Sequence, residues 1–316
     1  MPFSWSKNHP HLCSAPMHGI TNSAQRIIFK KYGADVVFSE MVSAMGLNYN
    51  NQKTIAKTKY SPKEKPIIIQ VFGNTIDETI KAALFAQAIG ADGIDFNCGC
   101  PARSMIASGH GGRLLLEPDK LIDILFTIKK NINLPLSLKT RIGYDQILPP
   151  SFYKKIVTQS HIDCLIIHGR TVKQKYQGQA NWDQVKQISQ SLSVPVIGSG
   201  DIVDPFQAVK HIKKYTPAGI MIGRGALGNP WIFQQSRAIL SGIKIRPRFN
   251  IKKIIKIILE HSRLMIKQTG QEQLAIIQMR KHYGWYIKNF PQAKSYRQQL
   301  FQAASLKQVK KILTQL

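Results

Sequence analysis

The chain has 316 residues, 43% of them hydrophobic, which is enough to bury a large core and excludes a disordered chain. It carries 44 Lys and Arg against 17 Asp and Glu, a formal net charge of +27, which favours a polyanionic partner, above all a nucleic acid, over an anionic membrane surface. Neither a run of about 18 uncharged apolar residues nor an apolar stretch near the start is present, so we expect a cytoplasmic protein without a membrane span or secretory signal.

From residue 12 to about 240, short apolar runs alternate with longer helical patterns. The eight runs are LCSAP, DVVFSE, PIIIQVFG, GIDFNCG, LPLSLKTR, DCLIIHGR, VPVIGSGD and AGIMIGRG. Between them lie segments such as DETIKAALFAQAIG and PDKLIDILFTIKKNI, whose apolar residues recur at the spacing of one helix face. Near-continuous apolar strands that alternate with amphipathic helices indicate a parallel sheet covered by helices. Eight such units predict an α/β fold, a (β/α)8 TIM barrel, over residues 1–240.

A break follows at residues 241–250, which contain Gly and Pro and which we interpret as a linker. Residues 251–316 show only helical patterns, with Asn250 and Ser305 as candidate N-caps, and predict a small all-helical C-terminal domain. Residues 241–316 hold sixteen Lys or Arg and two acidic residues, about half of the net charge of the chain. This balance is typical of a nucleic-acid-binding domain attached to a catalytic barrel, and a basic helical cap without a partner is the alternative.

Barrel enzymes place their sites at the carboxyl ends of the strands. The expected strands end at Pro16-Met17, Glu40, Gln70, Asn97 to Cys100, Lys139 with Arg141, His168 with Arg170, Ser199-Gly200-Asp201, and Gly223-Arg224. The last two ends, GSGD and GRGALGNPW, are rich in Gly, so backbone N–H groups can approach an anion there, with Arg224 as a charged partner. Because the loops after strands seven and eight often bind a phosphate, this pattern fits FMN with its ring over the barrel mouth.

The segment GRGALG (223–228) also matches the spacing of a dinucleotide-binding fingerprint. That fingerprint requires an acidic residue about 20 positions later to bind the ribose. Residues 229–259 contain neither Asp nor Glu, and no further strand pattern follows. The phosphate-loop interpretation is therefore favoured over a dinucleotide-binding unit.

Basic residues line the other strand ends. Lys139 and Arg141 lie two apart in one strand, so their side chains share a side, and two cations inside a barrel are costly unless they face a ligand or water. A Lys there would stabilise the negative charge of a reduced flavin, and Gln70 offers a donor and an acceptor to its imide edge; a hydrogen-bonded strand-end amide is the alternative for Gln70. We expect His168 to contact the flavin, and Arg141 and Arg170 to contact the substrate.

The four cysteines, Cys13, Cys98, Cys100 and Cys164, have the spacing of neither a disulfide framework nor a zinc site, so we expect no metal. Cys13 and Cys164 lie in apolar runs, which predicts core packing. Cys100 lies between Gly and Pro in a loop, where it cannot pack as a core thiol. A free thiol has an ordinary pKa of about 8.5 and is mostly protonated at neutral pH, as a proton donor must be. No activating base for a nucleophile is evident in the local sequence.

These segments together resemble the tRNA dihydrouridine synthases, over nearly the whole chain and most closely the bacterial B-type members. The motifs occur in order as APMHGITNSAQR, SEMV, IQVFG, DFNCGCPA, LKTRIG, IHGRT, GSGD, MIGRGALGNPWIF and MRKHYGWY. Three positions depart from the usual family pattern: His18 replaces a small residue, Asn22 replaces Asp, and Ser199 replaces Asn.

The resemblance implies an FMN-dependent oxidoreductase that takes electrons from NADPH or NADH and reduces the C5=C6 bond of uridines in tRNA. Hydride would pass from flavin N5 to C6, and Cys100 would give a proton to C5. The cofactor-binding residues implied are Pro16, Met17, His18, Gln70, Lys139, His168, Ser199, Gly200, Asp201, Gly223 and Arg224. The substrate-binding residues would be Asn97, Arg141, Arg170, Arg280 and Lys281. We expect a monomer whose partner is tRNA, with no membrane.

Two other functions share parts of this pattern. An FMN oxidoreductase acting on a small molecule, similar to dihydroorotate dehydrogenase, would have the barrel and the phosphate loops but no basic helical domain. A nucleic-acid-binding protein with an inactive barrel would have no use for Cys100, Lys139 and His168.

Overall fold

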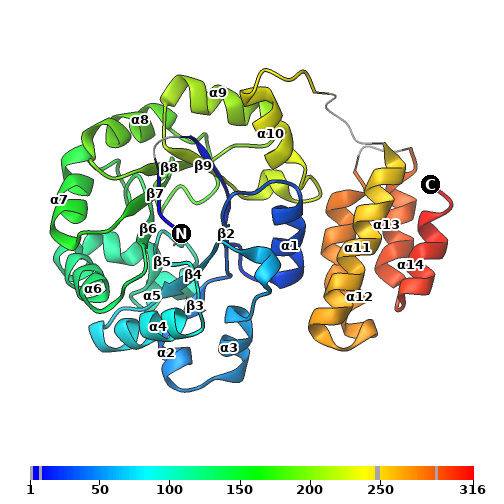
Figure 1. Cartoon of the computed structure of the whole chain (residues 1–316), viewed down its shortest axis with the longest axis horizontal. Helices are drawn as coiled ribbons and strands as arrows, with labels where there is room; N and C mark the ends of the chain where they lie inside the picture. Colours follow the sequence, from blue (N-terminus) through cyan, green and yellow to red (C-terminus); the bar gives the residue numbers. More distant parts are fainter. Residues whose placement is uncertain (1–2, 7–8, 246–249, 289–290) are drawn as a thin grey trace.

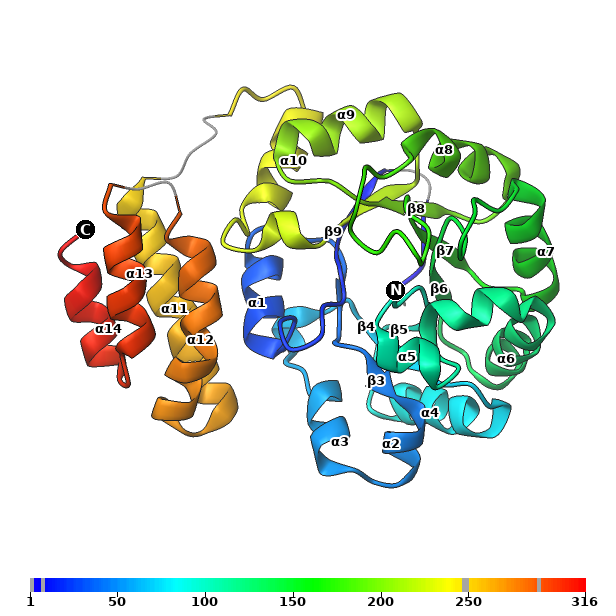
Figure 2. The same ribbon diagram turned by 180° about the vertical axis from the view of Figure 1, so that it is seen from behind.

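The computed structural model describes residues 3–6, 9–245, 250–288 and 291–316. Residues 246–249 of the predicted linker, Pro247 among them, lie outside the described residues. The described part forms a ring of strands enclosed by helices, beside a separate layer of four helices (Figures 1 and 2).

The strands form one parallel sheet in the order β1-β9-β8-β7-β6-β5-β4-β2. Their bounds are β1 His11–Ser14, β2 Val37–Phe38, β3 Val42–Ser43, β4 Ile67–Phe72, β5 Gly93–Cys98, β6 Leu136–Arg141, β7 Cys164–His168, β8 Val196–Ser199 and β9 Gly219–Ile222. A parallel bridge between Cys13 and Val36 brings β1 against the start of β2 and nearly closes the ring. All eight predicted strands are confirmed as a TIM barrel.

One detail of the second strand differs from the prediction. The pairing of that segment with β4 is interrupted between Phe38 and Val42, so it is divided into β2 and β3. The break contains Glu40, which the sequence placed at a strand end, and its carboxylate accepts a hydrogen bond from Gly19 N at 2.5 Å. Glu40 therefore binds the loop after β1 and is not part of a continuous ladder.

Helices cover the outside of the barrel in the alternation that the sequence predicts (Figure 1). They are α1 Ser23–Lys31, α2 Ala44–Asn48, α3 Gln52–Thr58, α4 Ile76–Ala88, α5 Arg103–Ala107, α6 Pro118–Asn131, α7 Pro150–Ser160, α8 Trp182–Ser191, α9 Pro205–Tyr215 and α10 Ile232–Leu240, with 3-10 helices η1 Pro62–Glu64, η2 Gly111–Leu116 and η3 Arg224–Ala226. The helix starts follow capping chemistry: Asn22 accepts a hydrogen bond from Gln25 N, as an Asp would. The substitution at position 22 therefore keeps the cap of α1.

The C-terminal region consists of α11 Ile251–Thr269, α12 Glu272–Tyr286, α13 Ala293–Gln302 and α14 Leu306–Leu313. Both predicted N-caps are confirmed, because Asn250 accepts from Lys252 N and Ser305 accepts from Gln308 N. None of the helices in the described ranges is long and apolar enough to cross a membrane.

Three hydrophobic clusters hold these layers. The largest lies between the strands and the surrounding helices. A second fills part of the barrel interior and includes the two cysteines predicted to be core residues, Cys13 and Cys164, both 0% exposed. The third belongs to the C-terminal helices but also contains Ala24 and Ile28 of α1 and Trp231. The C-terminal helices therefore pack directly on the barrel through α1, as Figures 1 and 2 show from both sides.

Candidate active site

A cavity of about 1310 Å³ lies at the carboxyl ends of the strands. This exceeds the roughly 300–1000 Å³ of a usual small-molecule pocket, so it has room for a cofactor and part of a second ligand. It contains most of the predicted site: Pro16, Met17, His18, Asn97, Cys100, Lys139, Arg141, His168, Ser199, Gly200, Asp201, Gly223 and Arg224. Strand ends far apart in sequence are thus brought to one place.

Four predicted site residues do not line this cavity. Gln70 is 0% exposed inside the barrel, and its amide is bonded to Asp95 and Asn97. Arg170 is 2% exposed, and its guanidinium binds the carbonyl oxygens of Gln177 and Gly178. The other two, Arg280 and Lys281, are on α12; Lys281 donates to Gly19 O and lies at a second cavity of about 340 Å³.

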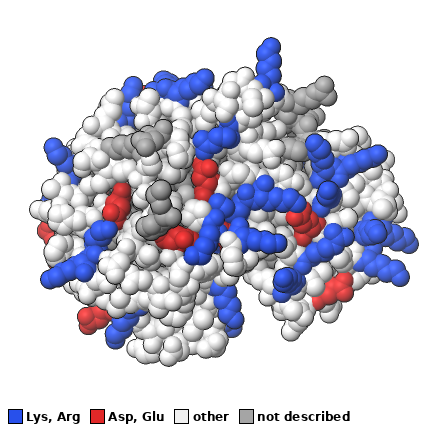
Figure 3. Space-filling view, in the orientation of Figure 1, with Lys and Arg blue, Asp and Glu red and all other residues white. Residues whose placement is uncertain are grey.

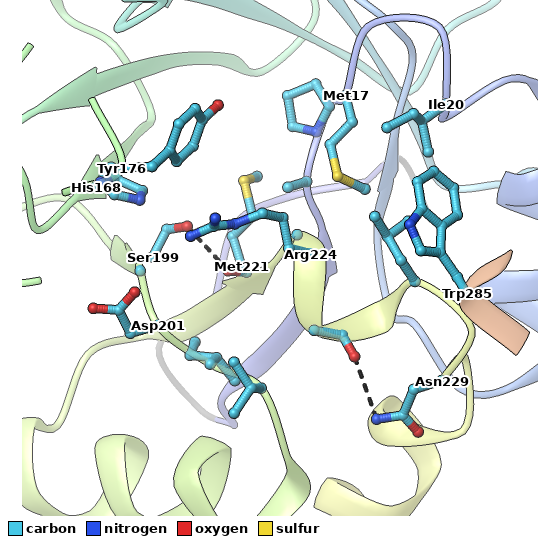
Figure 4. A pocket seen from close by; sticks show the side chains of 18 of the residues that line it. Met17, Ile20, His168, Tyr176, Ser199, Asp201, Met221, Arg224, Asn229 and Trp285 are labelled. Atoms are coloured by element: carbon cyan, nitrogen blue, oxygen red, sulfur yellow. Dashed lines mark hydrogen bonds between the residues drawn. The ribbon is translucent and has the colours of Figure 1, made fainter. Parts of the chain in front are cut away.

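The corner of the cavity at the carboxyl ends of β8 and β9 is built around backbone groups. Ser199 Oγ donates to Met221 O at 3.1 Å (dashed in Figure 4), so this hydroxyl is already used within the protein. Gly200 has φ +126°, and a Cβ there would lie 2.6 Å from Ala180 Cβ, so only Gly fits. Trp182 Nε1 donates to Gly200 O at 3.0 Å. The loop is therefore fixed from its outer side.

Asp201 completes this corner. It has φ +51°, an unusual conformation for a residue with a side chain. Its carboxylate accepts from Arg170 Nη2 at 2.8 Å and from Ala180 N at 2.7 Å. Arg170 and Asp201 thus tie the loop after β7 to the loop after β8.

Arg224 begins η3 at the cavity, where the first N–H groups of a helix lack intrahelical partners. Its guanidinium carbon lies 4.7 Å from the centre of the Tyr176 ring, and Figure 4 shows both side chains at the same pocket. Asn229 nearby donates to Gly225 O, while its buried Oδ1 has no partner among the described residues. A phosphate at this corner would find an Arg, backbone N–H groups and the conformation that Gly permits.

His168 and Lys139 give the floor its electrostatic character. His168 Nδ1 is buried and without a hydrogen-bond partner in the described part of the chain. Burial, followed by the charges of Arg141 and Lys139, lowers the pKa of His168 well below its ordinary value, so the imidazole is neutral. Burial also lowers the pKa of Lys139 to about 8, although the carboxylate of Asp95 acts in the opposite direction. Among the described residues His168 Nδ1 lacks a partner, and an anionic, hydrogen-bonding ring system would bind it and also pair with the Lys139 ammonium.

Arg141 lines the cavity but is largely engaged with loops. It donates to Gly99 O at 2.8 Å, to Thr171 O at 2.9 Å and to Lys175 O at 2.8 Å. Its guanidinium thus holds the loop after β5 against the loop after β7. Lys139, two residues earlier, holds no loop in this way in the described part of the chain, so the two cations of the predicted pair have different roles.

Cys100 also lines the cavity, in the loop between β5 and α5. It is the one cysteine of the chain that is not fully buried. Its backbone N–H donates to Asn97 Oδ1 at 3.1 Å, and its carbonyl accepts from Gly112 N at 3.1 Å. A thiol held in this way at a cavity wall can transfer a proton to a ligand inside it.

Several lining residues escaped the sequence reasoning. Tyr176 lies in a polar loop with no distinguishing pattern. The wall opposite the phosphate corner includes Trp231 with Ile254, Trp285 and Tyr286 of the C-terminal helices. MRKHYGWY was singled out as a motif, but only Arg280 and Lys281 were chosen from it, whereas Trp285 and Tyr286 are its residues that line the cavity. Among the described residues, no group of three or more His, Cys, Asp or Glu could hold a metal ion.

Known proteins share the fold of this chain. Two solved structures have the same fold: histamine dehydrogenase from Rhizobium sp. 4-9 (TM-score 0.58, 13% identity, 80% of this chain and 49% of that chain) and 2-naphthoyl-CoA reductase (TM-score 0.57, 12% identity, 77% and 52%). The chain thus spans about half the length of each of these larger proteins.

Similarity in sequence is closer to another group. tRNA-dihydrouridine synthase B of Pasteurella multocida is 35% identical over 90% of this chain and 86% of its own length. A probable tRNA-dihydrouridine synthase 1 of Synechocystis is 31% identical over 97% and 86%. The family model described as dihydrouridine synthase (Dus) matches residues 13–316. From the barrel, the site and these matches together, the chain belongs to the dihydrouridine synthase family.

Proposed function

We propose that this protein reduces the C5=C6 bond of uridines in tRNA, with FMN as cofactor and NADPH or NADH as electron donor. The observation that carries the proposal is that Cys100 lies in the wall of the same cavity as the phosphate corner and the basic floor. Family membership and the names of the similar proteins support the reaction and the tRNA substrate.

The residues present fit FMN. Arg224 and the Gly200 loop would hold its phosphate, and the unpartnered His168 Nδ1 and the Lys139 ammonium would meet the polar edge of its ring. Two predicted residues have other roles in this proposal. Gln70 would support Asn97 from inside the barrel, and Ser199 would contribute its backbone groups to the cofactor site. When bound, FMN supplies the hydride that reduces C6 of the uracil.

Cys100 would carry on its Sγ atom the proton that is transferred to C5 of the uracil. Arg141 Nε and Gly112 N bind the carbonyl groups of Gly99 and Cys100, which fixes the loop that carries the thiol. Holding a donor in a reactive geometry removes entropy that the transition state would otherwise lose.

The basic surface would bind the tRNA. On the face shown in Figure 3, Lys and Arg side chains gather over the C-terminal helices and over their junction with the barrel, where acidic residues are few. A base stacked inside folded tRNA cannot reach the cavity, so it must be extruded at a cost of a few kcal/mol, which phosphate contacts offset. Lys281, which lines the second cavity, would make such a contact, and Trp285, four residues later in α12, lines the large cavity.

We also propose the division of labour that the sequence suggested, with residues 1–240 as the catalytic part and 251–316 as the tRNA-binding part. The two parts are not fully separate in function, because Ile254 and Trp285 of the second part line the catalytic cavity. The helices would therefore position the extruded base as well as the tRNA body.

The test is direct. Purified protein is incubated with FMN, NADPH and an unmodified tRNA transcript, and dihydrouridine is measured by mass spectrometry of the nucleosides. We expect Cys100→Ala to retain flavin and to lose about 10²–10⁴-fold in rate. Ser104→Ala, which removes an exposed hydroxyl on the next helix, serves as the matched control and should be fully active. A wild-type protein that forms no dihydrouridine on any tRNA of its own cell would contradict the proposal.

A further inference from the structure

A chain of side-chain hydrogen bonds runs through the barrel below the cavity floor. Gln70 Nε2 donates to Asp95 Oδ2 at 2.6 Å, and Asn97 Nδ2 donates to Gln70 Oε1 at 3.0 Å. Asn97 Oδ1 then accepts from two backbone N–H groups, those of Gly99 at 3.2 Å and Cys100 at 3.1 Å. The chain thus leads from a carboxylate that does not line the cavity to the loop of the proposed proton donor.

This chain has a direction, and the carboxylate sets it. Asp95 Oδ2 is an acceptor whether the group is ionised or carries its proton on Oδ1, beside Ser137 Oγ, so it faces the NH₂ group of Gln70, whose oxygen must then face Asn97. The NH₂ group of Asn97 binds that oxygen, and its own oxygen is left for the loop. If Gln70 alone were reversed, its oxygen would face the carboxylate and its NH₂ group would face that of Asn97. If Asn97 were reversed as well, the N–H groups of the loop would meet a donor.

In the loop of Cys100, the N–H groups depend on this orientation but the carbonyl groups do not. Its carbonyl groups are held independently, since Arg141 Nε donates to Gly99 O and Gly112 N donates to Cys100 O. In the described part of the chain, Asn97 Oδ1 is the acceptor that holds its N–H groups. Losing that acceptor would leave the loop attached but free to tilt.

A buried carboxylate requires a reason, because an apolar side chain of similar size often serves a barrel interior as well or better. Asp95 is 0% exposed, and burial raises its pKa to about 7 against the opposing effects of Gln70, Ser137 and Lys139. Its second oxygen, Oδ1, accepts from Ser137 Oγ at 2.6 Å. The directional role described above accounts for retaining a group so costly to bury.

We propose that Asp95 is a positioning residue that orients the Cys100 loop through the amides of Gln70 and Asn97. The inference rests on the proposed role of Cys100 as proton donor for its effect on activity, but not for its effect on the loop. Asp95 itself touches neither cofactor nor substrate in this scheme.

Three variants test the proposal. Asp95→Leu removes the acceptor and should free the amides to reverse. Asp95→Asn should restore the wild-type behaviour, because its oxygen can accept from Gln70 while its NH₂ group donates to the hydroxyl of Ser137. Ser137→Ala is the matched control, since it removes an equally short buried hydrogen bond to the same carboxylate outside the chain.

The first readout is amide hydrogen exchange at Gly99 and Cys100 in the full-length protein. We expect exchange roughly tenfold faster in Asp95→Leu, the size of effect that loss of one hydrogen bond allows, and near wild-type in the other two variants. Equal acceleration in Ser137→Ala, or none in Asp95→Leu, would overturn the proposal. If Asp95→Leu does not fold, Gln70→Met interrupts the same series of hydrogen bonds at its next member. Its hydrogen exchange is then interpreted in the same way.

The second readout separates this inference from the proposed function. In tRNA reduction, we expect Asp95→Leu to lower kcat by about 10–100-fold with KM for tRNA unchanged, and Asp95→Asn to recover it. An inactive wild-type protein would defeat the proposed function, while the exchange contrast would still decide the role of Asp95. Wild-type kcat in an Asp95→Leu protein whose loop exchanges faster would show that the loop orientation does not matter for catalysis.

Discussion

Two buried histidines of the C-terminal helices should make that region sensitive to acid. His261 of α11 and His282 of α12 pack with ring centroids 4.6 Å apart and are 0% and 1% exposed. The Nε2 atoms of both rings lack a partner among the described residues, and the hydroxyl of Tyr286 lies 3.2 Å from His261 Nδ1. Burial lowers the pKa of His261 to about 3, and burial, aided by His261 and Lys281, lowers the pKa of His282 well below its ordinary value.

The direction and size of the effect follow from these pKa values. Because the folded pKa lies below the unfolded value of about 6.5, the unfolded state binds protons that the folded state does not. The contribution of each histidine to stability is therefore complete above about pH 6.5 and is lost as the pH falls. Between about pH 7 and pH 5 the loss from His261 should be about 2 kcal/mol, and His282 adds a loss in the same direction. This is a large part of the 5–15 kcal/mol that stabilises a typical domain.

The assay is urea unfolding followed by circular dichroism at these two pH values. The double variant His261→Asn, His282→Phe is the comparison, since it cannot titrate there while Asn keeps a polar atom near Tyr286. Other buried groups, such as His168, contribute equally to both proteins and cancel in the difference. We expect the pH-dependent loss to be smaller in the variant by at least about 2 kcal/mol. Equal losses in the two proteins would refute the assignment of acid sensitivity to this pair.

Three further predictions concern the site and the junction. Arg224→Met should weaken FMN binding by about 1.5–3 kcal/mol, the value of a charged hydrogen bond, as measured by flavin fluorescence; unchanged affinity would remove Arg224 from the phosphate corner. The affinity for tRNA should fall by about 10³-fold or more between about 50 and 200 mM salt if six or more phosphates are contacted, which filter binding can measure, and a flat response would argue against the basic surface. A chain ending at residue 240 should aggregate and melt at a lower temperature, because Ile28 and Trp231 lose their cover; light scattering would detect this, and a monomeric barrel of unchanged melting temperature would contradict it.

The sequence predicted the barrel well because its signal is repeated. Each apolar run was short and bounded by Gly, Pro or Asp, and each is a strand in the structure. The exception, the second run, is interrupted by Glu40, and a polar residue that binds a loop looks the same in sequence as one at a strand end. Strand periodicity gives the side to which a residue points, but not its interactions.

The same limit explains the site. Gln70 was predicted to contact the flavin, but it is buried inside the barrel, where Asp95 and Asn97 use both ends of its amide. Arg170 follows its strand by two residues, and the turn takes its guanidinium to neighbouring loops, away from the cavity. Trp285 reaches the site from the C-terminal helices, and no local pattern specifies a contact made across so great a sequence distance.

The packing of α1 has a consequence for synthesis of the protein. One side of this helix belongs to the barrel core through Phe29, while Ile28 lies in the core of the C-terminal helices. Lys31, at the end of α1, pairs with Glu260 of α11, which is 229 residues later in the chain. At about 5–20 residues per second, a ribosome needs roughly 10–45 s to make that distance. During this interval the apolar side of α1 has no cover, so the nascent barrel offers a transient binding surface for a chaperone until α11 emerges.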